Sequence, residues 1–409
     1  MTNSAPAPAD PRLDPLSRAT PAEAIAEATG ADGKVNLLDL DKAGLEALFA
    51  TIGEKPFRAV QLMKWLYHQR VSDFDQMSNL SQKFRDWLKA STEIRLPEIV
   101  TRQDSTDGTI KWLLRLDGGN SIETVYIPDG KRGTLCVSSQ VGCSLNCSFC
   151  STAKQGFNRN LTAGEIAGQM WIAQDALAHL KDEGVKHVVT NVVFMGMGEP
   201  LLNYRNVVTA AEVFMDDLAW GLGKRRVTVS TSGVVPALHR LRELTDVSLA
   251  VSLHAPDNAL RDELVPVNRR YPLEELMPAC KDFVRNAPRR HITWEYVMLK
   301  GINDQPEHAH KVLKLLRGIP SKMNLIPFNP FPGSGYETSS MNQVRRFQDI
   351  LAAGGLRTTI RKTRGDDIDA ACGQLKGQVE NRVRRLDETV RVHKASDREA
   401  SRADDGARS

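Results

Sequence analysis

Long hydrophobic runs are missing from this sequence of 409 residues. No stretch of about eighteen consecutive apolar residues occurs, so we expect no membrane-spanning helix. An apolar signal core is also missing near the start, and acidic residues such as Asp10 and Glu23 argue against a transit peptide. Cysteine is scarce, with six residues, which suits a reducing cytoplasm better than a disulfide framework. Neither charge sign dominates: the net charge of +4 permits a nucleic-acid partner without requiring one.

Three of the six cysteines, Cys143, Cys147 and Cys150, lie in one short segment directly after an apolar, β-branched run. Their spacing is C-x3-C-x2-C, and thiolates select zinc, copper(I) or iron–sulfur clusters. Structural zinc needs four ligands, and no second C-x2-C pair follows; a redox dithiol would leave Cys143 unexplained. A cubane [4Fe–4S] cluster normally takes four thiolates, so three would leave one iron open for chemistry. An open-site cluster is the favoured interpretation, with zinc and a dithiol as alternatives.

This cysteine spacing, with Phe149 before the last cysteine, resembles the signature of the radical S-adenosylmethionine (SAM) enzymes. In that superfamily the open iron binds the amino and carboxylate groups of SAM. The resemblance implies that the loop holds both the cluster and one end of SAM.

The N-terminal part of the chain divides at about residue 34. Residues 1–34 are rich in Ala, Pro, Asp and Thr without periodicity, which predicts a disordered arm. Residues 35–97 carry apolar residues at helical spacing, with Ser81 placed to cap a helix, and predict a small all-helical domain. Its basic residues are Lys55, Arg58, Lys64, Lys83, Arg85 and Lys89. They indicate either an RNA-contacting surface or only the solvated face of a packing module.

Residues 98–384 alternate strand-like and helix-like segments, and residues 385–409 are charged and unpatterned, typical of a disordered tail. Strands are expected at 111–116, 122–127, 134–138, 188–194, 226–231, 247–253, 292–298, 323–328 and 356–361, and helices at about 162–180, 205–218, 273–286, 306–317 and 341–353. Apolar strands alternating with helices indicate an α/β fold with a parallel sheet. The number of units favours a (βα) barrel, complete or partial, with its chemistry in loops after the strands.

Polar residues follow several of these strands. Gly198 and Glu199 lie in Met195-Gly-Met-Gly-Glu-Pro200, where glycine lets the backbone approach a ligand and a carboxylate suits an ammonium group. The other strand-end positions are Ser230, the run Ser252, Leu253 and His254, and Asn329. Their polar groups suit ribose hydroxyls or adenine edges, although each taken singly could be a turn or a loop cap.

Three cysteines lie apart from the cluster segment. Cys280 shares a helix face with Leu273 and Leu276, which predicts a buried core thiol. Cys136 lies inside the strand before the cluster and is interpreted as core by default. Cys372 follows the last strand near the expected barrel rim, so from chemistry alone it is either a buried or a reactive thiol.

Five longer segments carry a more specific resemblance. They are Glu123-Thr-Val-Tyr-Ile-Pro128, Cys136-Val-Ser-Ser-Gln-Val-Gly-Cys143, Ser151-Thr-Ala-Lys-Gln-Gly-Phe-Asn-Arg159, Met195-Gly-Met-Gly-Glu-Pro200 and Arg361-Lys-Thr-Arg-Gly-Asp-Asp-Ile-Asp-Ala-Ala-Cys-Gly-Gln-Leu375. These segments resemble the bacterial adenine-C2 RNA methyltransferases of the RlmN type. The similarity runs from about residue 40 to about residue 385 and shows no departure at a motif position.

The resemblance implies a radical-SAM partial barrel, one [4Fe–4S] cluster on the three clustered cysteines, and two SAM molecules consumed per turnover. The SAM site would be formed by Gly198, Glu199, Ser230, Ser252, Leu253, His254 and Asn329. Cys372 would take a methyl group from a first SAM, and a second SAM, cleaved reductively, would generate the radical that activates this S-methyl group for addition to adenine C2. Cys136 would release the product through a transient disulfide with Cys372, and Glu123 would act as the base.

The family acts on an adenosine in the peptidyl-transferase region of 23S rRNA and on the adenosine 3′ of the anticodon in tRNA. Arg225–Arg226, Arg269–Arg270 and Arg289–Arg290, with Lys224, are compatible with RNA phosphates. We also expect a flavodoxin-like electron donor, no membrane partner and a monomer. Two alternatives remain: methylation at adenine C8, as in antibiotic-resistance relatives, and a non-catalytic zinc-stabilised RNA-binding protein.

Overall fold

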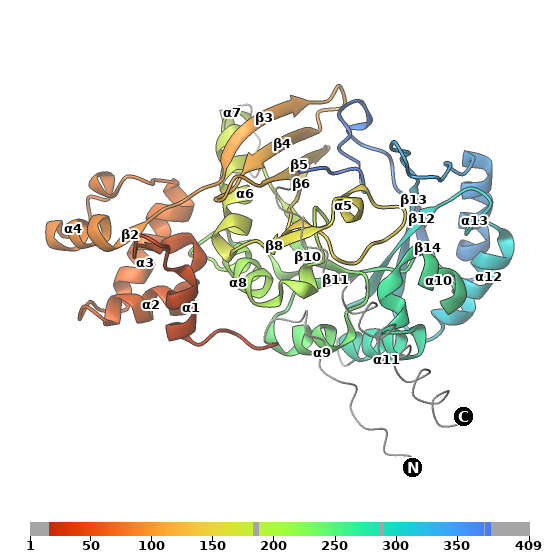
Figure 1. Ribbon diagram of the computed structural model, residues 1–409, viewed down its shortest axis with the longest axis horizontal. Coiled ribbons are helices and arrows are strands. Elements are labelled where there is room, and N and C mark those ends of the chain that lie inside the picture. Colours follow the sequence, from red (N-terminus) through yellow and green to blue (C-terminus); the bar gives the residue numbers. More distant parts are fainter. Residues whose placement is uncertain (1–15, 183–187, 286–289, 372, 378–409) are drawn as a thin grey trace, which may run out of the picture.

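The computed structural model describes residues 16–182, 188–285, 290–371 and 373–377. Its central element is a ten-stranded sheet in the order β14-β13-β12-β11-β10-β9-β6-β5-β4-β3 (Figure 1). The strands from β6 to β14 pair in parallel, whereas β3 to β6 are antiparallel. Within the described residues the order has two ends, β14 and β3, so the sheet forms a partial barrel. The predicted α/β partial barrel is confirmed.

The strands agree with the sequence pattern to within a few residues. The parallel strands are β6 (Arg132–Cys136), β9 (Asn191–Phe194), β10 (Val227–Thr231), β11 (Ser248–Ser252), β12 (Ile292–Met298), β13 (Ser321–Pro327) and β14 (Arg357–Ile360), and the antiparallel ones are β3 (Glu98–Asp104), β4 (Ile110–Arg115) and β5 (Ser121–Asp129). A separate hairpin pairs β7 (Gln140–Gly142) with β8 (Phe157–Asn160). The sequence did not predict β3 because every residue of that edge strand is exposed, or the hairpin because its strands are very short.

Helices cover the outer face of the parallel strands, as Figure 1 shows for α12 and α13 beside β12–β14. The predicted helices are α6 (Ala163–Ala176), α8 (Tyr204–Met215), α11 (Leu273–Val284), α12 (Pro306–Leu315) and α13 (Met341–Ala353); α5 (Ser151–Lys154), α7 (His179–Asp182), α9 (Val235–Leu244) and α10 (Asn258–Leu264) were not predicted. Among the described residues no helix combines the length and the apolarity that a membrane crossing requires.

Strand β12 shows how the barrel is divided between core and cavity. All seven of its residues are buried, but successive side chains point to opposite faces. Tyr296 packs on the outer side against Phe347 of α13, with ring centroids 5.3 Å apart. Glu295 and Val297 face the inside and line a cavity. The apolar outer face therefore holds the helices, while the inner face supplies polar groups to the site.

The N-terminal unit consists of α1 (Pro21–Ala28), α2 (Lys42–Ala50), α3 (Phe57–Met63), a π-helical turn (Lys64–Gln69) and α4 (Gln82–Ser91). The expectation of an unstructured arm fails at α1, because Thr20 and Glu23 form a capping box and Pro21 occupies the first turn. The unit is also not purely helical, since β1 (Val35–Asn36) pairs in parallel with β2 (Thr92–Glu93). The predicted tail, residues 385–409, lies outside the described residues.

The helical unit shares its apolar core with the barrel domain. Tyr67 makes edge contacts with Trp171 of α6 and with Trp220, at centroid distances of 6.5 and 5.6 Å. Val213 of α8 belongs to the same cluster of buried residues. This unit therefore packs against α6 and α8, at the left of Figure 1. The domain boundary near residue 97 stays a prediction.

Tyr67 allows a test of this shared core. We expect Tyr67→Ala to lower the free energy of unfolding by about 3 kcal/mol, because a buried aromatic ring is lost. The Tyr67 hydroxyl is buried without a hydrogen-bond partner among the described residues. Tyr67→Phe should therefore be neutral or stabilising by about 1 kcal/mol. Urea unfolding of the three proteins measures both effects; a large loss in the Phe variant would contradict this assignment.

Candidate active site

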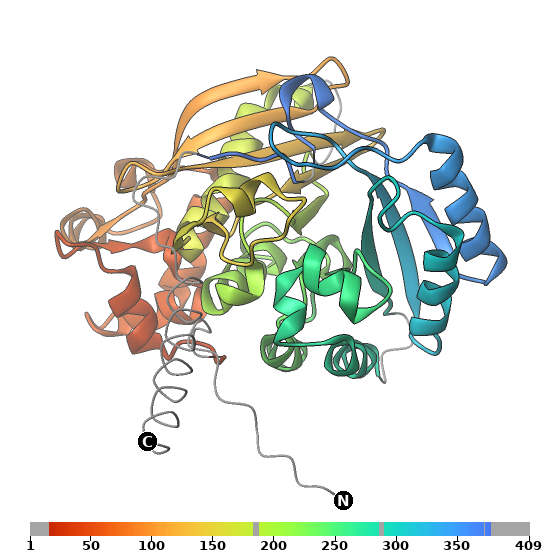
Figure 2. The same cartoon turned by 45° about the vertical axis from the view of Figure 1, so that its right-hand side comes forward.

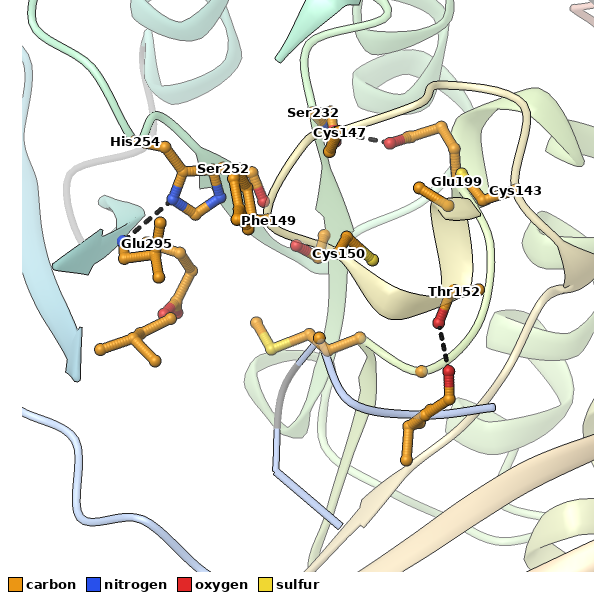
Figure 3. Close-up of a pocket in the computed structure, with 18 of the residues that line it drawn as sticks. Cys143, Cys147, Phe149, Cys150, Thr152, Glu199, Ser232, Ser252, His254 and Glu295 are labelled. Atoms are coloured by element: carbon orange, nitrogen blue, oxygen red, sulfur yellow. Dashed lines mark hydrogen bonds between the residues drawn. The ribbon is translucent and has the colours of Figure 1, made fainter. Parts of the chain in front are cut away.

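A cavity lies where the parallel strands end, and it encloses about 1050 Å³ when the open solvent at its mouth is included. Figure 3 shows residues from several strand-end loops pointing into it. It is lined by Cys143, Cys147, Cys150, Gly198, Glu199, Ser230, Ser252, His254 and Asn329, all of them predicted from the sequence. Leu253 is the exception, because its side chain is fully buried in the core and only its backbone takes part in local hydrogen bonds.

The cysteine loop is held in place by its own backbone. The amide of Cys143 donates to the carbonyl of Gly156 at 2.9 Å, closing the loop across the β7–β8 hairpin. Ser148 donates from its amide to the carbonyl of Leu264, at the end of α10, at 3.2 Å. The Tyr336 hydroxyl donates to the Ser148 hydroxyl at 2.7 Å. The loop is therefore anchored on both sides of Cys147.

The three thiols fit an iron–sulfur cluster. Burial raises the pKa of Cys143 and of Cys147, and the neighbouring cysteines raise both further. Thiolates at these positions therefore need a bound metal for stability. In the part of the chain that is described, no group of three or more His, Cys, Asp or Glu is arranged to hold a single ion. In a cubane cluster each cysteine binds a different iron, so that tight convergence is not required.

Glu199 is fixed by two backbone donors. Its Oε1 accepts from the Leu201 amide at 3.1 Å and its Oε2 from the Ser232 amide at 2.8 Å. Burial raises the pKa of Glu199, and these hydrogen bonds lower it. The side chains of Thr231 and Ser232 also lower the pKa of Glu199, so several neighbours hold this carboxylate in place. The preceding Gly198 has φ +99° and a Cβ there would lie 2.9 Å from the backbone nitrogen of Gln140, so no larger residue fits.

His254 is neutral and oriented. Burial, and after it the charge of Arg261, lowers the pKa of His254 to about 3. Its Nδ1 accepts a hydrogen bond from the Val297 amide at 3.0 Å, which leaves the proton on Nε2. The ring of Phe149 lies against it edge-on, with centroids 4.6 Å apart. The cavity thus contains an imidazole that donates a hydrogen bond without carrying charge.

A second cavity adjoins the first, and it encloses about 1020 Å³ when the open solvent at its mouth is included. Cys136 lines it, and the residues that line both cavities are Met195, Ile326, Pro327, Asn329, Arg361 and Leu375. Lys362 and Arg364 also line this second cavity. The two cavities therefore share a wall, and the second one has a basic rim.

Glu123 lies on the inner face of β5, two residues before Val125, which lines the second cavity. Its Oε1 forms an ion pair with Nζ of Lys111 at 3.1 Å, and both side chains are buried. Its Oε2 accepts from the backbone amide of Lys376 at 2.6 Å. Lys111 was not predicted, although a lone lysine inside an apolar strand pattern was a signal for it.

The C-terminal segment crosses the site beside Glu123. Ser151 donates from its amide to the carbonyl of Gly373 at 2.7 Å, and the Thr152 hydroxyl donates to the carbonyl of Leu375 at 2.9 Å. Gly377 packs so closely that a Cβ would lie 2.0 Å from the Ser121 carbonyl oxygen. Cys372 lies outside the described residues, but its neighbours Ala371 and Gly373 line the second and the first cavity, respectively.

The predicted basic pairs do not gather at these cavities. Lys224–Arg226 form a 3₁₀ turn just before β10, at the end of the sheet opposite the cavities. Lys224 and Arg290 both pair with Asp246. Arg289 lies outside the described residues. Arg269 ends a 3₁₀ turn that follows α10, so this pair is nearer the cysteine loop.

Comparisons with known proteins agree with this architecture. The family model described as the ribosomal RNA large subunit methyltransferase N-terminal domain matches residues 35–94, and that of the radical SAM superfamily matches residues 137–313. The dual-specificity RNA methyltransferase RlmN of Marinobacter nauticus is 58% identical over 369 residues, covering 90% of this chain and 100% of the relative. Its counterpart in Alkalilimnicola ehrlichii is 59% identical over 356 residues, covering 87% and 98%. The crystal structure of a radical SAM methyltransferase from Sphaerobacter thermophilus has a TM-score of 0.77 at 42% identity, covering 83% of this chain and 99% of that one.

A partial barrel whose mouth carries three cysteines on one loop defines a radical SAM enzyme, with a [4Fe–4S] cluster and SAM as its cofactors. Within the radical SAM enzymes, sequence identity close to 60% along almost the whole length of its relatives assigns the chain to one family. The chain belongs to the RlmN family of dual-specificity RNA methyltransferases.

The low pKa of His254 predicts how stability depends on pH. The unfolded ring takes up a proton as the pH falls below about 6.5, but the folded ring does so only near pH 3. The folded state is therefore destabilised across this window, by at most ~1.4 kcal/mol per pH unit. His254→Asn keeps an acceptor for Val297 and tolerates the φ of 57°. Urea unfolding of iron-free protein should show a shallower pH slope for this variant, whereas equal slopes would contradict the assignment.

Proposed function

We propose that this protein methylates C2 of adenosine in 23S rRNA and in tRNA, through an S-methylcysteine on Cys372. The observation that carries the proposal is the pair of adjoining cavities. One is lined by the cluster cysteines and the strand-end polar groups, and the other by Cys136 and basic residues. SAM in the first and the target base in the second would meet across their shared wall.

The cofactors would be held by residues of the first cavity. Cys143, Cys147 and Cys150 hold the cluster, and Glu199 binds the SAM amino group, with the strand-end serines, His254 and Asn329 around the nucleoside. When bound, the cluster supplies one electron for reductive cleavage of SAM, and SAM supplies the methyl group and the hydrogen-abstracting fragment. This chemistry suits adenine C2, an electron-poor carbon that cannot attack the SAM methyl group directly.

The protein's own groups act on the other side of the wall. Glu123 removes the C2 proton, and Lys111 holds its carboxylate in place and compensates its charge. Cys136 frees the product by attacking the sulfur of Cys372: the S–S bond of a transient disulfide forms and the bond from that sulfur to the methylene carbon breaks. The methylene carbon keeps the electron pair and takes up a proton to become the methyl group. Two thiols are required because the methyl carrier stays bonded to the base until another sulfur displaces it.

The RNA would reach the second cavity with the target base unstacked and turned inward. Lys362 at the cavity rim and Arg361 in its wall are suited to the phosphates beside that base, whereas Arg364 is already near the carboxylates of Asp107 and Asp129, at 3.7 and 3.9 Å. In the helical unit, Arg58 pairs with Glu54 and Lys89 with Asp75. Exposed Lys55, Lys64 and Lys83 are therefore the better candidates there for contacts with the RNA body.

The remaining assignments complete the proposal. We assign residues 35–97 to an RNA-contacting unit and residues 98–384 to the catalytic barrel. The enzyme acts as a monomer in the cytoplasm and receives its electrons from a flavodoxin-like donor. A reducing compartment agrees with a site that needs reduced thiols.

The reaction is tested with anaerobically reconstituted protein, SAM, a reductant and two substrates, a 23S rRNA fragment and tRNA. Mass spectrometry of the digested nucleosides should detect 2-methyladenosine in both RNAs. A product methylated at C8 would replace this assignment with the resistance-type activity. A colourless preparation that contains zinc and yields no product would favour the RNA-binding alternative.

Alanine substitution of the two proposed catalytic cysteines should have opposite effects on a covalent protein–RNA adduct. Cys136→Ala should accumulate a covalent protein–RNA adduct, because the thiol that releases the product is missing. Cys372→Ala should form none, because the methyl carrier is missing. Denaturing gels with labelled RNA distinguish the two variants. Equal adduct levels would contradict the assigned roles, and Cys280→Ala, which changes a core thiol, is the matched control.

Methylation kinetics and protein stability together distinguish the role of Glu123 from that of Lys111. Glu123→Gln should lower methylation by about 100-fold or more, the usual contribution of a general base, without weakening SAM binding. Lys111→Met leaves the buried carboxylate unpaired, so it should lower both activity and stability, the latter by about 3 kcal/mol. Single-turnover methylation and urea unfolding measure the two effects. Full activity of Glu123→Gln would exclude Glu123 as the base.

A further inference from the structure

Arg261 of α10 is a fully buried cation close to the cysteine loop, with 0% of its surface exposed. Its guanidinium makes four hydrogen bonds. Nε donates to the Leu253 carbonyl at 3.1 Å and Nη1 donates to Oδ1 of Asn268 at 2.7 Å. Nη2 donates to the carbonyls of Ser232 and Ser252 at 2.6 and 3.0 Å. All four acceptors are neutral.

This charge has no direct counter-charge in the described part of the chain. A buried charge is costly unless an opposite charge meets it, and no carboxylate there lies within ion-pair distance of Arg261. Asp262 is linked to it only through the amide of Asn268, which donates to Oδ1 of Asp262 at 2.6 Å. The thiol of Cys280 lies nearby, but burial keeps it protonated by raising its pKa. Hydrogen bonds occupy four of the five N–H donors and leave the charge without a counter-charge.

The nearest group that becomes negative in the working enzyme is the cluster. Ser232 and Ser252, whose carbonyls accept hydrogen bonds from Arg261, line the first cavity together with Cys147. Figure 3 shows Ser232 beside Cys147. The backbone carbonyl of that same Ser232 is held by Arg261, and the last residue of α10 anchors Ser148 of the cysteine loop. Arg261 therefore acts on the cluster site by charge and by orientation.

We propose that Arg261 is the buried counter-charge of the iron–sulfur cluster, a positioning residue that favours the cluster's one-electron reduction. The inference rests on the cluster assignment but not on the RNA substrate. A cluster held by three thiolates is an anion, and reduction adds one electron from an external donor without a proton. A fixed cation in a site of low dielectric constant stabilises that added charge. Reduction is the step that must precede SAM cleavage, so this charge would help to set how readily the enzyme starts.

The test is an anaerobic redox titration of the reconstituted holoenzyme with dithionite, without RNA, followed by electron paramagnetic resonance. Arg261→Met removes the charge, and Arg261→Lys keeps it while changing the hydrogen bonds. We expect the Met variant to lower the reduction equilibrium constant about tenfold, a midpoint potential about 59 mV more negative. The Lys variant should stay near the wild type. Equal potentials in all three proteins would overturn the proposal.

A matched variant separates charge from packing. Asp262→Asn removes a negative charge at the other end of the Arg261–Asn268–Asp262 chain, so its potential should shift in the opposite direction. A purely structural role of Arg261 would not produce shifts of opposite sign. A negative shift in Asp262→Asn equal to that of Arg261→Met would therefore contradict an electrostatic role.

If Arg261→Met binds no cluster, its potential cannot be titrated. Iron content and urea unfolding of the iron-free proteins then test the proposal. Without iron the charge is uncompensated, so the iron-free Met variant should be at least as stable as the iron-free wild type, whereas the Lys variant should still bind iron. Loss of stability in both iron-free variants, with loss of iron in both, would show that the side chain only supports the fold. Failure of RNA methylation with normal potentials would instead count against the proposed substrate and leave this inference intact.

Discussion

A charge removed from water needs hydrogen bonds, and its burial stays costly until an opposite charge is also close, and this constraint organises the mouth of the barrel. Glu123 meets it through Lys111 and the Lys376 amide, and Glu199 through two backbone amides. Arg261 has its hydrogen bonds but no adjacent carboxylate. The site is therefore held rigidly where its carboxylates already have partners. Arg261 remains as a buried cation that can offset the negative charge of the iron–sulfur cluster.

The same constraint ties together segments that are far apart in the chain. Glu123 on β5 accepts from the backbone of Lys376, and Thr152 on α5 donates to the carbonyl of Leu375. The C-terminal segment is thus fastened both to the strand that bears the proposed base and to the helix that follows the cluster cysteines. A shift of this segment would disturb both cavities at once, which fits a reaction in which two SAM-dependent steps share one thiol.

The barrel interior departs from the filled core of a closed (βα)₈ barrel. Glu295 and Asn324 sit side by side on β12 and β13, with a hydrogen bond of 2.8 Å, and Thr359 of β14 donates to Asn324 at 2.6 Å. These polar inner residues leave room for ligands, while the apolar outer residues of the same strands hold the helices. The alternation of side chains along each strand therefore separates the residues that stabilise the fold from those that bind ligands. The helices that pack on the outer side of β12–β14 are seen in Figure 2.

The local sequence pattern predicted much of the fold and part of the candidate site. Alternating apolar strands and helices predicted a (βα) barrel, complete or partial, and the cysteine spacing predicted an open-site cluster. The partial barrel and the SAM-binding roles of Gly198 and Glu199 followed from the family resemblance. These features are encoded by residues close together in the chain. Arg261 and the cavity that Cys136 shares with the C-terminal segment could not be predicted in this way. The hydrogen-bond partners of Arg261 lie only 7 to 29 residues away, but nothing in the sequence of α10 indicates that this arginine is buried. Cys136 and Leu375 are far apart in the chain, and the lone Lys111 in an apolar strand was a signal that did not identify its partner Glu123. Only the tertiary structure decided which charges are buried together, because burial and distance depend on how the sheet curves and not on sequence spacing.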